Sequence, residues 1–375
     1  MNTTAVISGD FMRRSVKAAI TAAAKQAAIP SLETICFSLD REAVTVESSD
    51  LEQGIKAIIP AKVEGYADFV LHNDEAKRLL NIKGGAITIH YNECGEQADI
   101  MFSDGKKKLS FKKRIFDKSK DWISFGADSY EQYAEFEAES FMEAVKRCAV
   151  FKAANDTQPI LQGFAFDGDY LETLDGLRAF LTKMSGTFYN SEKFAVCGKL
   201  ENVKTMFDKS ETLVFEKAAK YVKLSTDNGI HLDYILRIIQ GEIFPLRKNC
   251  IPKQFVARMT IEAETLKTIC KEAKSYVKGS APMPIVFKAE NGKGRITLAY
   301  PDFRYDETFE AESYEGAEMY AGYKAAYMLD GLNAFKGEID INFSGTLTPM
   351  VISQGDDMAI VLPVRLSPET KQATA

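Results

Sequence analysis

A recurring order of secondary-structure patterns constrains this chain more than any single motif. Apolar residues at intervals of three and four predict a helix over residues 11–27 and a second over 73–82. Alternating apolar and polar residues predict strands at 33–40, 42–50, 53–61 and 86–91. This pattern is typical of an α+β protein in which helices pack on antiparallel sheets.

The same order returns twice along the chain. Its second copy has a helix over 141–154, strands at 160–168 and 170–174, a short helix or loop over 199–209, and strands at 211–227 and 229–239. The third has a helix over 264–279, strands at 284–292 and 294–300, a helix over 324–335, and strands at 339–345 and 356–366. We therefore predict three repeated domains, each with two helices on antiparallel sheets, at 1–130, 131–253 and 254–375. Three unrelated α+β modules are the alternative, because short helices and meandering sheets are common.

Length and composition limit the number of domains and the class of protein. The 375 residues exceed one ordinary domain. The chain has no run of about 20 apolar residues, and its start lacks the order of a signal peptide, so we expect a cytoplasmic protein that does not enter a membrane. Six cysteines without a CxxC pair indicate buried free thiols rather than disulfides or a zinc site. The polar segment 367–375 is expected to be a short disordered tail.

Catalytic patterns are missing from the sequence. The three histidines lie far apart and none has a second ligand at metal-binding spacing. The chain has neither a P-loop nor a GxSxG elbow, and the run 291–294 between two strands is typical of a hairpin turn. We therefore predict a protein that is not an enzyme and needs no cofactor or metal.

Charge is unevenly distributed along the chain. The net charge of −6 argues against binding to nucleic acid. Basic residues nevertheless concentrate on the predicted helices, and segment 11–30 carries four of them with no acidic residue. A solvated face explains any one such helix, but recurrence in each repeat favours contact with DNA phosphates without sequence preference.

Several motifs together resemble the bacterial sliding clamp, the beta subunit of DNA polymerase III. The chain ends in an apolar run, Pro, apolar, Arg and Leu over 360–366, as the family's closing strand does. Further matching segments are 29–30, 49–52, 159–163, 175–178, 241–245 with Pro252, 327–330 and 347–349. The resemblance covers essentially the whole chain and fits a divergent bacterial or phage-borne member.

The resemblance implies a ring. Two subunits would close head to tail around double-stranded DNA, with the helices lining the hole, as a homodimer that gives the replicative polymerase its processivity. The implied partners are that polymerase, the clamp loader and other proteins with clamp-binding motifs. The residues expected to face DNA are Lys25, Lys77, Arg78, Lys152, Lys199, Lys271 and Lys274.

The resemblance also implies a pocket for partner peptides and a dimer interface. The pocket residues expected by motif match are Leu161, Leu174, Gly176, Leu177, Arg178, Pro245, Cys250, Tyr327, Val361, Leu362, Pro363, Val364 and Arg365. Residues 107–113 read as an edge strand whose Leu109 and Phe111 would meet Tyr276 and Val277 of the other subunit. Lysines that protect a free edge from aggregation are the alternative for this segment.

The chain departs from the family at the pocket. The family commonly has Thr and His where this chain has Leu174 and Leu177, and Leu where it has Ala179. Leu246 and Arg247 replace the usual acidic and aromatic residues. We therefore expect a pocket that is retained but reshaped. The other functions considered are a phage-type processivity scaffold of different oligomeric state and, less favoured, an enzyme acting on nucleotides or sugars.

Overall fold

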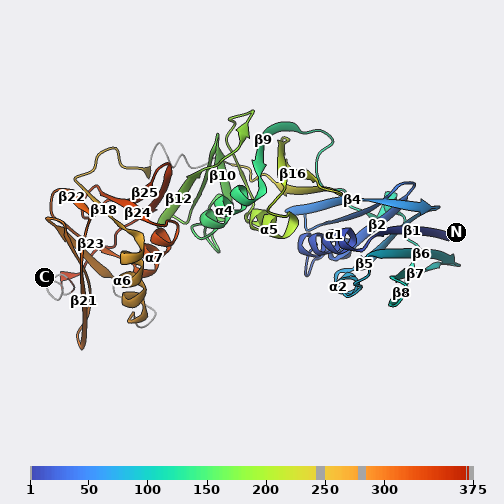
Figure 1. The fold of residues 1–375 in the computed structure, drawn as a ribbon, viewed down its shortest axis with the longest axis horizontal. Helices are drawn as coiled ribbons and strands as arrows, with labels where there is room; N and C mark the ends of the chain where they lie inside the picture. Colours follow the sequence, from blue (N-terminus) through green and yellow to red (C-terminus); the bar gives the residue numbers. More distant parts are fainter. Residues whose placement is uncertain (1, 242–249, 278–283, 369, 371–375) are drawn as a thin grey trace. The chain divides into compact units, whose positions relative to one another are not determined.

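The computed structural model of the chain describes residues 2–241, 250–277, 284–368 and 370 (Figure 1). Two compact units form it: Met1–Glu143 with Ser185–Gln240, and Ala144–Met184 with Gly241–Ala375. Both are α+β with antiparallel strand pairs, as the sequence predicts. The two units divide residues 131–253 between them, and the three predicted domain boundaries remain a prediction. No helix among the described residues is long and apolar enough to cross a membrane.

The first unit is built on one sheet, in the order β13-β9-β15-β16-β17-β4-β1-β6-β7-β8, with β3, β2 and β5 attached in turn to β4; β14 is not part of this sheet. Its strands are β1 (Asn2–Ser8), β2 (Thr34–Asp40), β3 (Ala43–Ser49), β4 (Gln53–Glu64), β5 (Tyr66–His72), β6 (Ala86–Cys94), β7 (Gln97–Ser103), β8 (Lys108–Arg114), β9 (Glu131–Glu137), β13 (Thr187–Phe188), β14 (Phe194–Val196), β15 (Thr212–Lys217), β16 (Tyr221–Asp227) and β17 (His231–Arg237). Its helices are α1 (Gly9–Ala22), η1 (Pro30–Glu33), α2 (Asn73–Leu79), α3 (Lys118–Asp121), η3 (Gly198–Asn202) and α5 (Val203–Met206), and α4 (Ala138–Ala149) begins here.

Helix α1 packs on strands β3 and β4 through one apolar face (Figure 1). Met12, Val16 and Ala19 follow the three-to-four-residue spacing and are fully buried. The helix ends at Ala22 rather than at the predicted residue 27, because Ala23 is extended. The N–H of Ala24 then donates to the carbonyl of Leu32 at 2.9 Å, which ties the loop to η1.

The strands of the first unit bury aromatic side chains on one face. Phe37 stacks on Phe69 with ring centroids 5.1 Å apart, and Phe102 meets both rings edge-on. Alternation in β2 and β5 places these rings on the same side of the sheet, as period-two patterns require. This cluster makes the sheet the rigid base on which the surface residues of the unit are held.

The second unit contains two sheets, in the orders β10-β11-β12-β26-β25-β24-β18-β22 and β21-β20-β19-β23. Its strands are β10 (Phe164–Asp167), β11 (Tyr170–Leu174), β12 (Arg178–Lys183), β18 (Ala257–Glu262), β19 (Ile285–Glu290), β20 (Lys293–Tyr300), β21 (Phe303–Glu310), β22 (Ser313–Gly316), β23 (Met319–Tyr323), β24 (Glu338–Phe343), β25 (Met350–Gln354) and β26 (Asp357–Val361). Its helices are η2 (Pro159–Gln162), α6 (Ala263–Ser275) and α7 (Ala325–Asn333), and α6 and α7 pack together (Figure 1).

Three sequence-based expectations need correction. Residues 160–163 are not extended, because Pro159 starts the 3-10 helix η2 and the strand begins only at Phe164. Helix α4 runs from Ala138 to Ala149, three residues earlier at its start than predicted. Of the expected tail, only residues 367, 368 and 370 are described, and Thr370 is not exposed as a free tail would be: it is 4% exposed and its N–H donates to the Ser367 hydroxyl at 3.1 Å.

The six cysteines are all free thiols, and they differ in how deeply they are buried. Burial raises the pKa of Cys36, Cys197 and Cys270 to about 12, whereas Cys94 is exposed. The thiolate is the reactive form, so a raised pKa and a closed surface both slow alkylation. We expect iodoacetamide at pH 8 to label Cys94 in the native protein and the three buried thiols only after denaturation, as read by peptide mass mapping. Equal labelling of Cys36 and Cys94 in the folded chain would contradict the burial.

Candidate binding sites

A tight loop between β11 and β12 forms one wall of an apolar pocket in the second unit. The Asp175 carboxylate accepts bonds from the N–H groups of Leu177 and Arg178, both at 2.9 Å. Gly176 has φ +84°, a conformation that glycine adopts without steric cost. The N–H of Leu362 donates to the carbonyl of Leu177 at 2.9 Å, so the chain leaving β26 is fixed against this loop.

Arg178 is held rigidly at the pocket. Its Nε donates to Asp175 at 2.9 Å, and its Nη1 forms an ion pair with Asp330 of α7. The guanidinium lies 4.8 Å from the ring centre of Tyr327 and 5.7 Å from that of Phe151. Two carboxylates and two aromatic faces leave this side chain little freedom, which suits it to shape a binding surface.

The pocket has a volume of about 440 Å³ and is mostly apolar. Its lining comes from the 174–179 hairpin, the 250–252 segment, the loop after β24 and the end of β26: Leu174, Gly176, Arg178, Ala179, Cys250, Ile251, Pro252, Ser344, Thr348, Pro349, Ile360 and Leu362. Ala179, Val351 and Ile360 are buried beneath it, with Leu174 and Leu362 packed against them. Space of this size and polarity suits large apolar side chains of a ligand.

Two polar groups modify this apolar lining. Burial raises the pKa of the Cys250 thiol, and the nearby charge of Glu172 raises it further, so the neutral thiol lines the pocket at neutral pH. The hydroxyl of Ser344 is buried and has no hydrogen-bond partner in the described part of the chain.

Five of the predicted pocket residues line the pocket, and the other predicted residues that the structure describes do not. Leu174, Gly176, Arg178, Cys250 and Leu362 line it, and Tyr327 touches it through Arg178. The remaining predicted residues lie elsewhere: Leu161 is buried in η2, Leu177 is exposed at the loop tip, Val361 packs against Gly331 of α7, Pro363 and Val364 continue toward β23, and Arg365 is exposed. Pro245 lies outside the described residues.

Sequence reasoning missed part of the lining. Ser344, Thr348 and Pro349 come from the loop after β24, whose irregular backbone has no periodicity to show which side chains face inward. Ile251 and Pro252 flank the predicted Cys250, so their apolar character was the available signal.

Five of the seven residues predicted to face DNA are exposed, and Lys152 and Lys199 are half-buried. Lys25 and Lys152 follow the ends of α1 and α4, so they lie on loops rather than on the helices as predicted. Lys77 Nζ lies 2.7 Å from the Asp74 carboxylate, and Lys199 Nζ lies 3.6 Å from that of Asp50. These ion pairs reduce the local positive charge, and DNA contact by all seven residues remains a prediction.

Each unit has a sheet with an edge strand that pairs on one side only. Strand β8 pairs only with β7 among the described strands, and β21 pairs only with β20. β8 carries four basic residues and no acidic one, whereas β21 carries three acidic residues and one arginine. Tyr276 packs on Phe303 and Tyr305 of β21, with ring centres 5.1 Å and 5.4 Å away. Of the predicted interface residues, Leu109 and Phe111 thus lie on the basic edge, and Tyr276 packs against the acidic one.

Known proteins with the same fold cover nearly the whole chain. Residues 248–365 match the family model of the DNA polymerase III beta subunit, C-terminal domain. The beta sliding clamp of Halalkalibacterium halodurans is 24% identical, over 96% of this chain and 99% of its own. The solved sliding clamp from Bacillus subtilis has a TM-score of 0.86 at 19% identity, over 98% of this chain and 100% of its own. The beta subunit from Thermotoga maritima has a TM-score of 0.84 at 20% identity, over 97% and 100%.

The fold of solved sliding clamps extends over nearly the full length of the chain, and residues 248–365 match the DNA polymerase III beta subunit family. At 24% identity to a beta sliding clamp over 96% of its length, the chain resembles a divergent bacterial DNA polymerase III beta subunit.

Proposed function

We propose that two copies of this chain close into a ring around duplex DNA and tether the replicative polymerase to its template. The protein would act in the cytoplasm as a processivity factor, without catalysis and without a cofactor. The observation that carries the proposal is the clamp fold over the whole chain. A ring holds DNA by topology, so a few exposed lysines with weak, salt-sensitive attraction to phosphates suffice.

Opposite charge on the two sheet edges supports head-to-tail closure. β8 of one copy would continue the sheet that ends at β21 of the other, by main-chain hydrogen bonds between antiparallel strands. The basic side chains of β8 would meet the acidic side chains of β21, and Leu109 would add an apolar contact near Tyr276 and Val277. A heterologous joint of this kind closes when its rotation completes a circle.

The apolar pocket supports binding of short partner peptides. Aliphatic and aromatic side chains of a peptide match its lining. The solved clamp from Pseudomonas aeruginosa bound to griselimycin has a TM-score of 0.84 with this chain. That relative shows that a clamp of this fold accepts a ligand.

Retention on DNA of different topology tests the function. After loading onto nicked circular plasmid, the protein is expected to stay bound during gel filtration in high salt. Linearising the same plasmid at a single site should release it, because only a ring needs free ends to escape. Equal release from both forms, with monomeric mass in solution, would instead favour a scaffold of another oligomeric state. Turnover of a nucleotide or sugar without DNA or partners would favour an enzyme.

A further inference from the structure

Two places in the chain share one hydrogen-bond pattern. In the first unit, the Asp50 carboxylate accepts bonds from the N–H groups of Glu52 at 3.0 Å and Gln53 at 2.9 Å, as Asp175 does in the pocket loop of the second unit. The N–H of Arg237 donates to the carbonyl of Glu52 at 2.8 Å, matching the bond from Leu362 to the pocket loop. We name these places the first joint (residues 48–56 and 233–237) and the second joint (residues 173–181 and 358–362).

Strand register extends the match residue by residue. Gly54 pairs with Ile235 of β17 at the first joint, and Ala179 pairs with Ile360 of β26 at the second. The hydroxyl of Ser48 donates to a carbonyl of α1 at 2.8 Å, and that of Thr173 donates to a carbonyl of α4 at 2.6 Å. Gly54 therefore corresponds to Ala179, the floor of the apolar pocket.

The two joints differ in what covers this floor. A strap of residues 122–130 crosses the first joint, and its Phe125 lies directly on Gly54. A Cβ at residue 54 would lie 2.6 Å from Cδ1 of Phe125. The ring also meets Tyr221 edge-on at 5.0 Å. At the second joint the segment 250–252 lies beside the floor, and the described residues leave about 440 Å³ open.

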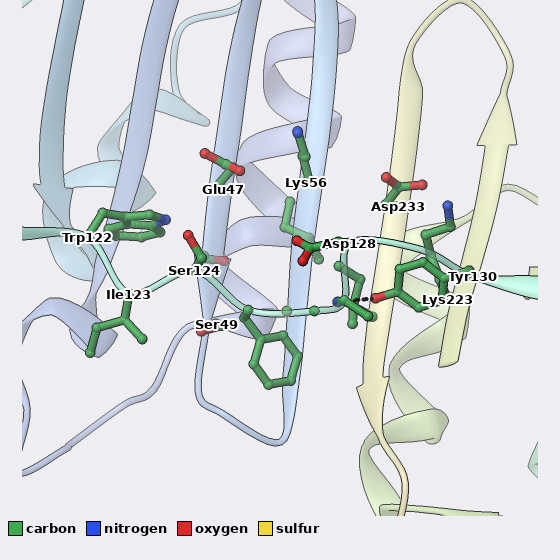
Figure 2. A pocket seen from close by; sticks show the side chains of 17 residues that line it. Glu47, Ser49, Lys56, Trp122, Ile123, Ser124, Asp128, Tyr130, Lys223 and Asp233 are labelled. Carbon is green, nitrogen blue, oxygen red and sulfur yellow. Dashed lines mark hydrogen bonds between the residues drawn. The ribbon is translucent and has the colours of Figure 1, made fainter. Parts of the chain in front are cut away.

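The rest of the first joint is a smaller cavity of about 310 Å³. Figure 2 shows the strap residues Trp122, Ile123 and Ser124 crossing beside Glu47 and Ser49. Lys56 pairs across the strands with Glu47 on one side and with Asp233 on the other, so the surroundings of the cavity are charged.

The strap is fastened at its ends rather than at its centre. The N–H of Trp122 donates to the carbonyl of Lys118 at 3.3 Å, and the Lys118 ammonium donates to the Ser38 hydroxyl at 3.0 Å. At the other end, the N–H of Ala127 donates to the Tyr130 hydroxyl at 3.0 Å. Within the described chain, residues 123–126 make no hydrogen bond, so side-chain packing by Phe125 holds the centre.

We propose that the first joint is a latent second peptide-binding site, closed by Phe125 as a built-in ligand. A peptide with an aliphatic and an aromatic side chain takes the place of residues 123–126 when Phe125 is removed. The inference rests on the proposed function only in treating the open pocket as a peptide site. Because the joints lie in different units, each can be disabled separately.

The test uses the peptide acetyl-Ile-Ser-Phe-Gly-amide, which copies residues 123–126 and contains no tryptophan. Trp122 is the only tryptophan in the chain, so its emission reports displacement of the strap. In a Leu362→Asp background, which disables the second joint, Phe125→Ala is expected to bind one peptide per chain with a change in Trp122 emission. Its affinity should exceed that of Leu362→Asp alone by at least about tenfold, because the competing aromatic anchor is gone.

Two further variants make the result specific. Adding Gly54→Val to the double variant should remove the binding, because the new side chain fills the floor. Phe116→Ala is the matched control, since Phe116 also packs in this segment, 6.5 Å from Trp122, but does not line the cavity. This control should leave the affinity at the level of Leu362→Asp alone.

A folded Phe125→Ala, Leu362→Asp protein that binds no peptide and shows no change in Trp122 emission would overturn the inference. Gly54→Ala alone gives an independent test, because its Cβ must push Phe125 away and shift Trp122 emission. An unchanged Trp122 emission spectrum in that variant would also count against the proposal that Phe125 closes the first joint. Failure of the proposed function would give a different result. The chain with its natural Phe125 and Leu362 would then bind no peptide at the second joint.

Discussion

Leu362→Asp is expected to weaken binding of a short peptide with leucine and phenylalanine anchors by about 100-fold. Leu362 lines the pocket beside the buried Ala179 and Ile360, so the new carboxylate would face apolar ligand groups without a partner. The fold should survive, because Leu362 is only half-buried and its hydrogen bond to Leu177 uses the main chain. Fluorescence anisotropy of the labelled peptide measures the effect, and circular dichroism checks the fold.

Leu347→Asp is the matched control for this experiment. Leu347 is 63% exposed and lies next to the lining residue Thr348, but it does not line the pocket itself. The same charge change at that position should alter peptide affinity by less than about threefold, since an exposed carboxylate keeps its water. Undiminished affinity in folded Leu362→Asp protein would rule out this pocket as the peptide site.

For the proposed ring, Leu109→Asp is expected to raise the dimer dissociation constant by about 100-fold, which would convert the dimer to monomers at micromolar concentration. Leu109 is half-buried on the edge strand β8, opposite Phe102. Its replacement would direct a carboxylate toward the acidic strand β21 of the other copy. Native mass spectrometry and sedimentation measure the shift, and persistent dimers would count against this interface.

Ser110→Asp controls for the added charge, because successive side chains of a strand point to opposite faces. Dimerisation should fall much less in that variant. Phe111 is the wrong residue to substitute in this experiment. It is 8% exposed and packs on Phe102 at 6.2 Å, so its loss would disturb the first unit itself. The attraction between the edges should also weaken as salt rises from 50 mM to 500 mM.

Periodicity predicted only some of the elements. It predicted α1, α6 and strands such as β2, β3, β4, β19 and β20, because burial on one face leaves a repeating pattern in the sequence, but it did not predict β1, β5, β7, β9, β18, β21 or β25. It failed at element ends. The loop after α1 and the helix η2 depend on a contact with Leu32 and on the fixed φ of Pro159, neither of which has a period.

The pocket shows the same division. Motif likeness alone marked the loop 175–178, and the structure explains that segment by its local hydrogen bonds to Asp175. It could not separate Ile360, which lines the pocket, from Val361, which packs against α7, because the two residues are equally apolar. Which face each residue takes is set by its pairing with β12.

The sequence by itself determined the α+β class, the recurring order of elements, the basic character of β8 and the likeness to sliding clamps. Those properties depend on the local spacing of apolar residues, on charge and on short motifs, all of which can be read directly from the sequence. Only the tertiary structure decided that Phe125 covers Gly54, whereas the described residues leave a pocket beside Ala179. At each joint the floor residue and the segment beside it lie about 70 positions apart in the chain. A separation in sequence does not indicate which residues lie close together across a sheet.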